Sequence, residues 1–384
     1  MKILFLTTIL LSQSRNGSEV GTQCFIDALK ENGYQVSVLG YLRKGDSLEK
    51  ADQDVFVVSE RYVETKSSKT NALYWMVLSF LKNLPYSSVK YLSKQYIDLI
   101  KEFLEKDDYE IVIIDHPQLC WLVPFIKKNI KIITISHNLE HELYIEAAKN
   151  TNNFMSNLVY RREAHLIKKQ EDQLATTAQQ IWTVTENDAK YFSRLELGAK
   201  ALAFTQPPAS EKLLEKPLDK EFDIGLLGSW TWRANEEALQ WFINEIYPLI
   251  PLNLSIHIAG KGADWLIGKY SNINYRGVVP DAQEFMAQAR VVAIPTLSGG
   301  GIQIKTLDAI ASGSLIVATS ASVRGITYLP CTIQVVDKPK EFAQLLISSV
   351  TLPFSPQAFS EARNWYQARR QKFVRDVAYA IRNL

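Results

Sequence analysis

The stretch PTLSGGGIQIKTLDAIASGSLIVAT, residues 295–319, decides the fold. A short apolar run, Val291–Pro295, leads into three consecutive glycines at positions 299–301. Apolar residues then recur at helical spacing until Gly313, and a glycine is typical of a helix end. The β-branched run Leu315–Thr319 that follows predicts a buried parallel strand. The order strand, glycine loop, helix and strand indicates a parallel α/β fold.

The same stretch carries the parts of a phosphate site. Glycines permit a positive φ and let a ligand approach the backbone, and the free N–H groups at a helix start suit an anion. Lys305 and Asp308 are three positions apart, on one side of the predicted helix and away from its apolar stripe. A lysine beside a phosphate, with a carboxylate that accepts ribose hydroxyls, would form a nucleotide-diphosphate pocket. A glycine-rich turn with a solvated Lys–Asp pair is the alternative.

Length and composition set the class of protein. The chain has 384 residues, enough for two domains that each bury a core. Its net charge of +2 argues against a dedicated nucleic-acid surface. The three cysteines are far apart and odd in number, which favours neither a disulfide framework nor a cysteine zinc site. We therefore expect a cytoplasmic protein without a nucleic-acid partner.

Strand and helix patterns alternate in two successive series. In the first series, the polar segment Tyr41–Asn71 is expected to be irregular. A proline-containing linker is predicted at 206–208, and the alternation restarts at Phe222–Leu227. This organisation predicts two Rossmann-like, doubly wound α/β domains, residues 1–205 and 206–359, that face each other across a cleft. Ligands of such folds bind at the carboxyl ends of the strands.

No stretch of the sequence is long and apolar enough to span a bilayer. Residues Met1–Leu11 lack the small-x-small cleavage pattern of a signal peptide, and we expect them to contain the first buried strand. The most apolar window, Ala72–Leu84, is predicted to be a core or interface helix. Peripheral contact with a membrane surface is the alternative.

Polar and cationic residues follow the predicted strands of the second half. Ser229 and Arg233 follow its first strand, Lys261 follows the second, and Lys305 follows the glycine loop. Because the carboxyl ends of parallel strands share one edge of a sheet, we expect these cations to converge. Convergent cations and helix starts can neutralise a departing diphosphate without a bound metal. Separate surface cations are the alternative.

Two histidines, His116 and His137, follow predicted strands in the first half. The pentapeptide 137–141, HNLEH, also matches H-x-x-E-H, a zinc-protease signature. Zinc chemistry would need both of its histidines on one helical turn. Since His137 directly follows an apolar strand, a polar residue facing the cleft is the preferred interpretation. A structural loop histidine and a zinc hydrolase through His137, Glu140 and His141 are the alternatives.

The second half resembles the nucleotide-binding domain of GT-B glycosyltransferases, in particular the retaining family-four-like group, glycosyl transferases group 1. The resemblance rests on Gly228–Asn235 and on Pro295–Gly325, of which the second block is specific. It also implies a final helix, Ser360–Leu384, that crosses back to the first domain. The first half resembles these enzymes more weakly, through Lys2–Leu6, Gly17–Gly21, Ile135–His141 and Trp182–Asp188.

The resemblance implies transfer of a hexose from a nucleotide-diphosphate sugar to an acceptor hydroxyl, without a metal or other cofactor and with retention at the anomeric carbon. The expected catalytic residues are Arg233 and Lys305, beside the diphosphate, and His137, near the sugar. Asp308 matches the ribose-binding carboxylate. The expected donor-binding residues are Gly17, Ser18, Ser229, Lys261, Gly299, Gly300, Gly301, Ile302 and Asp308.

The base, UDP or GDP, and the acceptor, whether a glycan, a lipid-linked sugar or a small molecule, are left open within polysaccharide or glycoconjugate biosynthesis. The chain also departs from the family pattern. Asp308 stands where glutamate is usual, and Gly300 takes the place of the partner glutamate. Ser229 replaces a common arginine, and Asn138 replaces the aspartate that usually follows the histidine. Because of these departures, a catalytically degenerate partner protein that binds a nucleotide sugar is the alternative.

Overall fold

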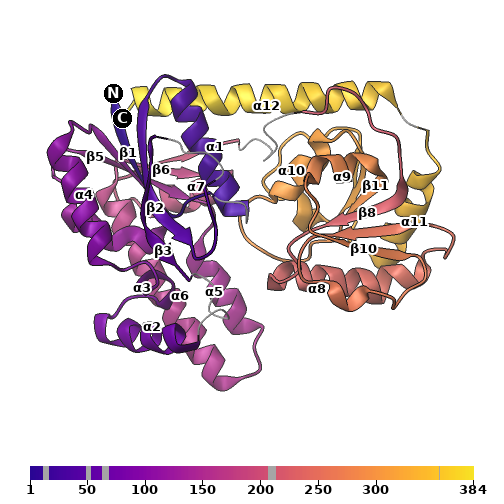
Figure 1. Cartoon of the computed structure of the whole chain (residues 1–384), viewed down its shortest axis with the longest axis horizontal. Helices are drawn as coiled ribbons and strands as arrows, with labels where there is room; N and C mark the ends of the chain where they lie inside the picture. The colour runs from indigo at the N-terminus through magenta and orange to yellow at the C-terminus, as the bar shows by residue number, and fades with distance from the viewer. Residues whose placement is uncertain (12–16, 49–52, 63–68, 206–212, 354) are drawn as a thin grey trace. The chain divides into compact units, whose positions relative to one another are not determined.

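The computed structural model describes residues 1–11, 17–48, 53–62, 69–205, 213–353 and 355–384. The chain divides into two compact units (Figure 1), residues 1–205 with 373–384, and residues 206–372. Each unit contains one parallel sheet with flanking helices, which confirms the predicted α/β class. The predicted linker at 206–208 lies outside the described residues. Within the described ranges, no helix is long and apolar enough to cross a membrane.

The first unit is built on seven parallel strands in the order β3-β2-β1-β4-β5-β6-β7. Its central strands are apolar along most of their length because both faces of the sheet are covered. The strands are β1 (Lys2–Ile9), β2 (Gln35–Arg43), β3 (Val55–Arg61), β4 (Ile111–Asp115), β5 (Lys131–Ser136), β6 (Gln180–Thr183) and β7 (Lys200–Ala203).

Helices cover both faces of this first sheet. On one face, Tyr96, Leu119 and Leu174 belong to the core that includes Val112 of β4. On the other face, Phe25 of α1 packs against aromatic side chains that include Phe373, in the last part of α12. The helices are α1 (Gly17–Glu31), α2 (Lys69–Lys82), α3 (Tyr86–Val89), α4 (Lys94–Lys106), η2 (Pro117–Phe125), α5 (Glu140–Lys149), α6 (Phe154–Thr177), α7 (Glu186–Arg194) and α12 (Pro356–Arg382).

The second unit has six parallel strands in the order β10-β9-β8-β11-β12-β13. These are β8 (Phe222–Leu227), β9 (Ile256–Ala259), β10 (Ile273–Gly277), β11 (Ala289–Ile294), β12 (Leu315–Ala318) and β13 (Ile333–Val335). One core cluster joins the sheet to α8, η3 and α11, and a second joins it to α9 and α10. The helices are α8 (Arg233–Trp241), η3 (Phe242–Ile246), η4 (Tyr247–Leu249), η5 (Asp264–Leu266), α9 (Ala282–Gln288), α10 (Ile304–Ala311), η6 (Ser320–Val323) and α11 (Pro339–Val350).

The sequence analysis predicted that the segment Tyr41–Asn71 is irregular. This prediction is wrong in part. Strand β3 lies within the segment and extends the sheet, with Val38 of β2 paired to Val55. As an edge strand, β3 is only partly buried, and its apolar run Val55–Val58 is a strand signal that the sequence analysis missed. The last helix, α12, begins at Pro356, four residues before the predicted start, and passes from the second unit into the first.

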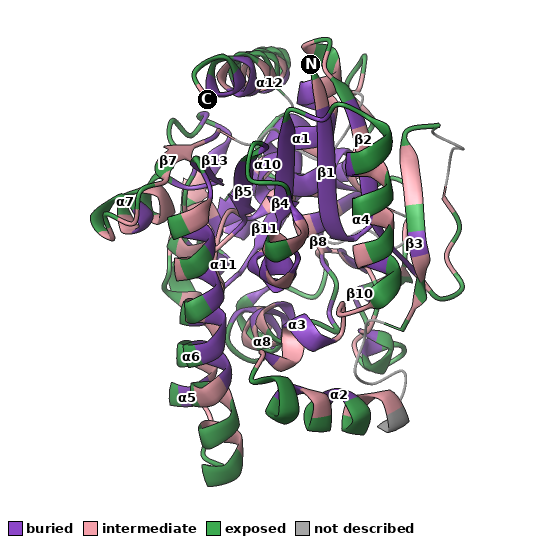
Figure 2. Cartoon of the chain, turned by 90° about the vertical axis from the view of Figure 1, so that its left-hand side faces the viewer, coloured by how far each residue is buried: buried purple, intermediate pink, exposed green. Residues whose placement is uncertain are grey.

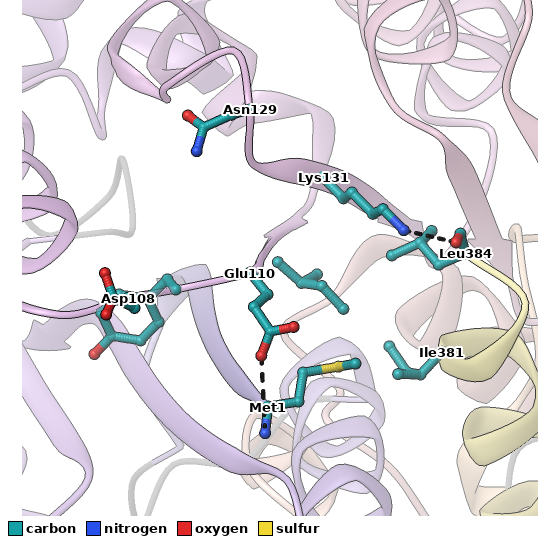
Figure 3. A pocket seen from close by; sticks show the side chains of 9 residues that line it. Met1, Asp108, Glu110, Asn129, Lys131, Ile381 and Leu384 are labelled. Atoms are coloured by element: carbon teal, nitrogen blue, oxygen red, sulfur yellow. Dashed lines mark hydrogen bonds and ion pairs between the residues drawn. The ribbon is translucent and has the colours of Figure 1, made fainter.

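Both strand orders reverse direction at one point, between β1 and β4 in the first unit and between β8 and β11 in the second. Ligands of doubly wound sheets bind at the carboxyl ends of the strands beside such a switch point. A pocket between the chain termini (Figure 3) lies at the opposite edge of the first sheet, where Met1 and Glu110 precede β1 and β4. It is therefore not the candidate site.

Candidate functional site

The loops after β8 and β11 are joined by one asparagine that the sequence analysis did not assign. Asn235, in the first turn of α8, donates from Nδ2 to the backbone oxygen of Ser229 over 3.0 Å. Its Oδ1 accepts a hydrogen bond of 2.9 Å from Nζ of Lys305, in the first turn of α10. Trp230 anchors the first loop, because its buried Nε1 donates to the backbone oxygen of Ala259. Lys305 is therefore held at the switch point of the second sheet.

Lys305 and Asp308 do not form the solvated pair that was the alternative interpretation. Asp308 is buried, with 6% of its surface exposed, one turn after Lys305 on α10. Burial lowers the pKa of Lys305 to about 8. An ammonium group whose charged form is disfavoured by burial would be stabilised by a nearby anion.

The glycine loop adopts the backbone conformation that its sequence predicted at two positions. Gly299 and Gly301 have φ angles of 124° and 60°, which side-chain-bearing residues rarely adopt. At Gly299 an added Cβ would lie 3.5 Å from the side-chain nitrogen of Gln303. Gly300 and Ile302 complete the same loop before α10, and both are positioned where the donor-contacting loop was expected.

Arg324 is the second residue that the sequence analysis left without a role. It follows η6, beyond the carboxyl end of β12, and its Nε lies 3.4 Å from the backbone oxygen of Gly301. Its Nη2 atom is buried and has no hydrogen-bond partner among the described residues. The same nitrogen lies 3.9 Å from an ideal Cβ on Gly299. A buried guanidinium nitrogen without an acceptor, beside a glycine loop, is suited to an anion.

The other predicted site residues of this unit follow the strands β8 and β9. Arg233 begins α8, its side chain is 56% exposed, and its Nε is 2.7 Å from Oε1 of Glu237. Lys261 is exposed in the loop after β9, where its backbone oxygen accepts from Trp230. Ser229 is exposed and its hydroxyl lies 3.2 Å from that of Thr231. Lys305 is bonded to Asn235 and Arg233 pairs with Glu237, and the convergence of the three cations stays a prediction.

In the first unit, His137 belongs to a hydrogen-bonded network centred on Asp115, the last residue of β4. Nε2 of His137 lies 2.8 Å from Oδ1 of Asp115. The hydroxyls of Thr7 and Thr22 donate to Oδ2 of Asp115 over 2.8 and 2.7 Å. Burial raises the pKa of Asp115, but its interactions with His116 and His137 outweigh burial and lower the pKa to about 2.

The first turn of α1 is tied to this network. Thr22 also donates to the backbone oxygen of Ser18 over 3.0 Å, so one hydroxyl links the helix start to Asp115. Gly17 is the first residue of the helix. The structure therefore brings Gly17, Ser18 and His137 to the carboxyl edge of the first sheet.

His116 is a further member of this network, and the sequence analysis gave it no role. Its φ is 78°, and its ring centroid lies 4.7 Å from that of His137. Burial lowers its pKa to about 4. Possible ligand atoms of Asp115, His116 and His137 lie within 4.8 Å of one another. Both oxygens of Asp115 already accept hydrogen bonds, from Thr7 and Thr22 at Oδ2 and from His137 at Oδ1.

The zinc-protease geometry is not formed at residues 137–141. His137 lies in the loop before α5, whereas His141 lies within that helix. The two histidines are bonded to different carboxylates, because Nδ1 of His141 is 2.5 Å from Oε2 of Glu171. Glu140 is partly buried, and burial raises its pKa to about 7. The loop position of His137 is the geometry that the apolar strand before it predicted.

Comparisons with known proteins identify the second unit. Residues 221–350 match the family model for glycosyl transferases group 1. No curated protein matches the chain in sequence. The matched residues contain the glycine loop and its flanking strands, so the match agrees with the resemblance that this loop carries.

Solved structures similar to the chain are glycosyltransferases. Sucrose-phosphate synthase from Thermosynechococcus elongatus is 13% identical with a TM-score of 0.65, covering 100% of this chain and 97% of that one. WaaG, a glycosyltransferase involved in lipopolysaccharide biosynthesis, is 15% identical with a TM-score of 0.61, covering 98% and 99%. Anabaena Alr3699/HepE in complex with UDP-glucose is 13% identical with a TM-score of 0.59, covering 100% of both chains. This likeness shows a GT-B fold with two Rossmann-like domains.

Proposed function

We propose that this chain, a glycosyltransferase of the group 1 type, transfers a hexose from a nucleotide-diphosphate sugar to an acceptor hydroxyl without a metal and with retention of configuration. The observation that carries the proposal is the pair of cations at the glycine loop. Lys305 is held there by Asn235, and Arg324 directs toward the same loop a buried nitrogen that has no partner in the described part of the chain. Together they offer two positive charges to a diphosphate.

The proposed diphosphate site uses the backbone as well as the side chains. Among the described residues, an added Cβ on Gly299 would meet only side-chain nitrogens, of Gln303 at 3.5 Å and of Arg324 at 3.9 Å. The first backbone N–H groups of a helix such as α10 have no acceptor within the helix and suit an anion. Asn235 accepts one of the three ammonium hydrogens of Lys305 and so orients the rest of the ammonium group. Asp308, buried one turn later, is the proposed acceptor of ribose hydroxyls.

The proposed reaction forms one bond and breaks one bond at the anomeric carbon. The bond from that carbon to the diphosphate oxygen breaks, and Lys305 and Arg324 stabilise the negative charge that develops on the diphosphate. The acceptor hydroxyl attacks from the side that the diphosphate leaves, and a phosphate oxygen takes its proton. His137 is the proposed polar contact for the sugar, held in one orientation by Asp115. This route needs no protein nucleophile.

The uridine series is a reasonable first choice of donor, because a similar solved structure holds UDP-glucose. We would measure thermal shifts with UDP-, GDP- and dTDP-sugars, each with and without EDTA. The proposal predicts an upward shift with one nucleotide series that EDTA does not change. No shift with any of them would contradict the sugar-donor site, and an EDTA-sensitive shift would contradict metal independence.

A nucleotide-sugar-binding protein without catalysis is the second candidate, favoured by the glycine at position 300. Isothermal titration would measure binding of the stabilising donor, and released nucleotide would measure turnover. Tight binding with neither hydrolysis nor transfer to any acceptor supports this second candidate, whereas release of nucleotide on addition of an acceptor supports the transferase.

A further inference from the structure

The helix α2 exposes an unusually apolar surface on the first unit (Figure 2). Only one side of this helix packs on the protein, through Trp75 and Ser79, which are nearly fully buried. At least half of the surface of each of six apolar side chains on the other side is exposed: Leu73, Tyr74, Met76, Val77, Phe80 and Leu81. Of the two predictions for Ala72–Leu84, a core helix is wrong because one side of it faces outward, and an interface helix stays a prediction.

The exposed side chains follow helical spacing. Positions 73, 74, 77, 80 and 81 repeat along one side of α2, and the packed positions 75 and 79 repeat along another. A helix that is apolar around its whole circumference is typical of a buried environment. In the described chain, α2 is packed against the protein on one side only.

The start of α6 continues the same surface. Phe154, Met155, Leu158 and Val159 are each more than half exposed. One turn later, the guanidinium of Arg162 lies 4.3 Å from the ring centroid of Phe80 and donates to the hydroxyl of Ser79 over 2.9 Å. Arg162 thus fastens α2 to α6. We call the exposed side chains of residues 73–81 and 154–159 the apolar face.

The two sequence segments that carry the apolar face contain charges of one sign. No acidic residue occurs in the sequence from 65 to 97 or from 147 to 162. These two segments contain eight basic residues, whereas the whole chain has a net charge of only +2: Lys66, Lys69, Lys82, Lys90, Lys94, Lys149, Arg161 and Arg162. Without acidic residues to balance them, these segments carry a net positive charge in a chain that is almost neutral.

We propose that the apolar face docks on an anionic lipid surface. Apolar and aromatic side chains would enter the boundary of the acyl chains, while the lysines contact anionic headgroups, as in other interfacial helices. A protein partner fits less well, because lysine is depleted from the centres of protein–protein interfaces. The helix would lie on the bilayer, since α2 does not have the length and apolarity to cross it. This inference does not depend on the proposed reaction.

The test is flotation of the purified full chain with vesicles. One set contains phosphatidylcholine alone, and the other contains equal parts of phosphatidylcholine and phosphatidylglycerol. We expect binding to the anionic set that weakens at high salt, because surface charges are screened. Equal binding to both sets, or no binding to either, would overturn the proposal.

Matched substitutions locate the binding surface. The variant Leu73→Gln/Leu81→Gln changes side chains that are 64% and 77% exposed, and Leu252→Gln/Ile267→Gln, the control in the second unit, changes side chains that are 67% and 69% exposed. We expect the first variant to lower vesicle affinity by at least about tenfold and the control to leave it unchanged. Equal loss in both would contradict the assignment to this face. A dimer detected by light scattering and abolished only by the first variant would identify a second copy, not lipid, as the occupant.

Discussion

Each sheet of this molecule has a polar cluster at the carboxyl ends of its strands, and the two clusters differ in charge and in hydrogen bonding. In the first unit, the carboxylate of Asp115 accepts hydrogen bonds at both oxygens and its pKa is lowered to about 2. In the second unit, burial lowers the pKa of Lys305 to about 8, and Arg324 has a buried nitrogen without a partner among the described residues. The carboxylate at the centre of the first cluster has its partners in place, whereas the second cluster has unused hydrogen-bonding capacity.

This difference separates structural polarity from binding polarity. A buried group whose partners are all in place stabilises the fold, and removing it should be detected mainly in the free energy of unfolding. A buried cation that lacks a counter-charge destabilises the ligand-free protein and is compensated when an anion binds. Substitutions in the two clusters should therefore have opposite signatures.

The largest expected effect is on turnover, from Lys305→Ala. A charge-assisted contact to the diphosphate is worth about 1.5–3 kcal/mol. Its loss should lower kcat/KM for the sugar donor by about 10–150-fold. The measurement is steady-state transfer, or donor hydrolysis where the acceptor is unknown.

The matched control for that variant is Lys338→Ala, which removes an exposed lysine of the same unit that pairs with Glu341. We expect full activity from it, because exposed ion pairs contribute little. If Lys305→Ala retained wild-type kcat/KM, Lys305 would have no role at the diphosphate and the comparison of the two clusters would fail.

The next effect is on stability, from Asp115→Asn in the first unit. A carboxyl whose pKa is lowered from 3.8 to about 2 on folding stabilises the folded state above pH 4, and this stabilisation is lost as the pH falls through 2. Its removal should lower the free energy of unfolding at pH 7 by about 2 kcal/mol. Urea unfolding of the variant and of Asp107→Asn, a surface control paired with Lys2, would measure this. Equal stability of the two variants would show that the Asp115 network is not structural.

Arg324→Gln should separate binding from stability. It removes a guanidinium nitrogen that has no partner among the described residues, so we expect the ligand-free protein to unfold at the same urea concentration or a higher one. Affinity for the sugar donor should fall by about tenfold, the equivalent of one charge-assisted hydrogen bond. A lower free energy of unfolding with unchanged donor affinity would show that Arg324 stabilises the fold and does not bind the donor.

The fold could be predicted from sequence wherever a strand is buried on both faces. The run Val291–Pro295, the glycine loop and the following helix form one continuous local signal, and the structure has them as β11, loop and α10. Strand β3 carries a similar but shorter signal, the apolar run Val55–Val58, which the sequence analysis did not use within its polar surroundings.

The sequence predicted the glycine loop of the candidate site but not the side-chain contacts around it. The position of Lys305 followed from the glycine loop, but its partner Asn235 lies 70 residues earlier in the chain and carries no local signal. Arg324 could have been found as one more cation after a strand end, that of β12. The ion pair between Arg233 and Glu237, four residues apart on α8, was not considered in the sequence analysis. In the ligand-free chain, Glu237 competes with the predicted ligand for Arg233.

The smallest expected effect tests the charge of Lys305 without removing it. Because its pKa in the ligand-free protein is lowered to about 8 by burial, the ammonium form that binds a diphosphate is depleted above that pH. The pH dependence of kcat/KM reports groups of the free enzyme, so kcat/KM should fall by about fourfold between pH 7 and 8.5. Lys305→Arg should abolish this decline, since a guanidinium keeps its proton in that range. A decline that persists in Lys305→Arg would assign the titration to another group, whereas its disappearance would show that the second cluster binds as a cation.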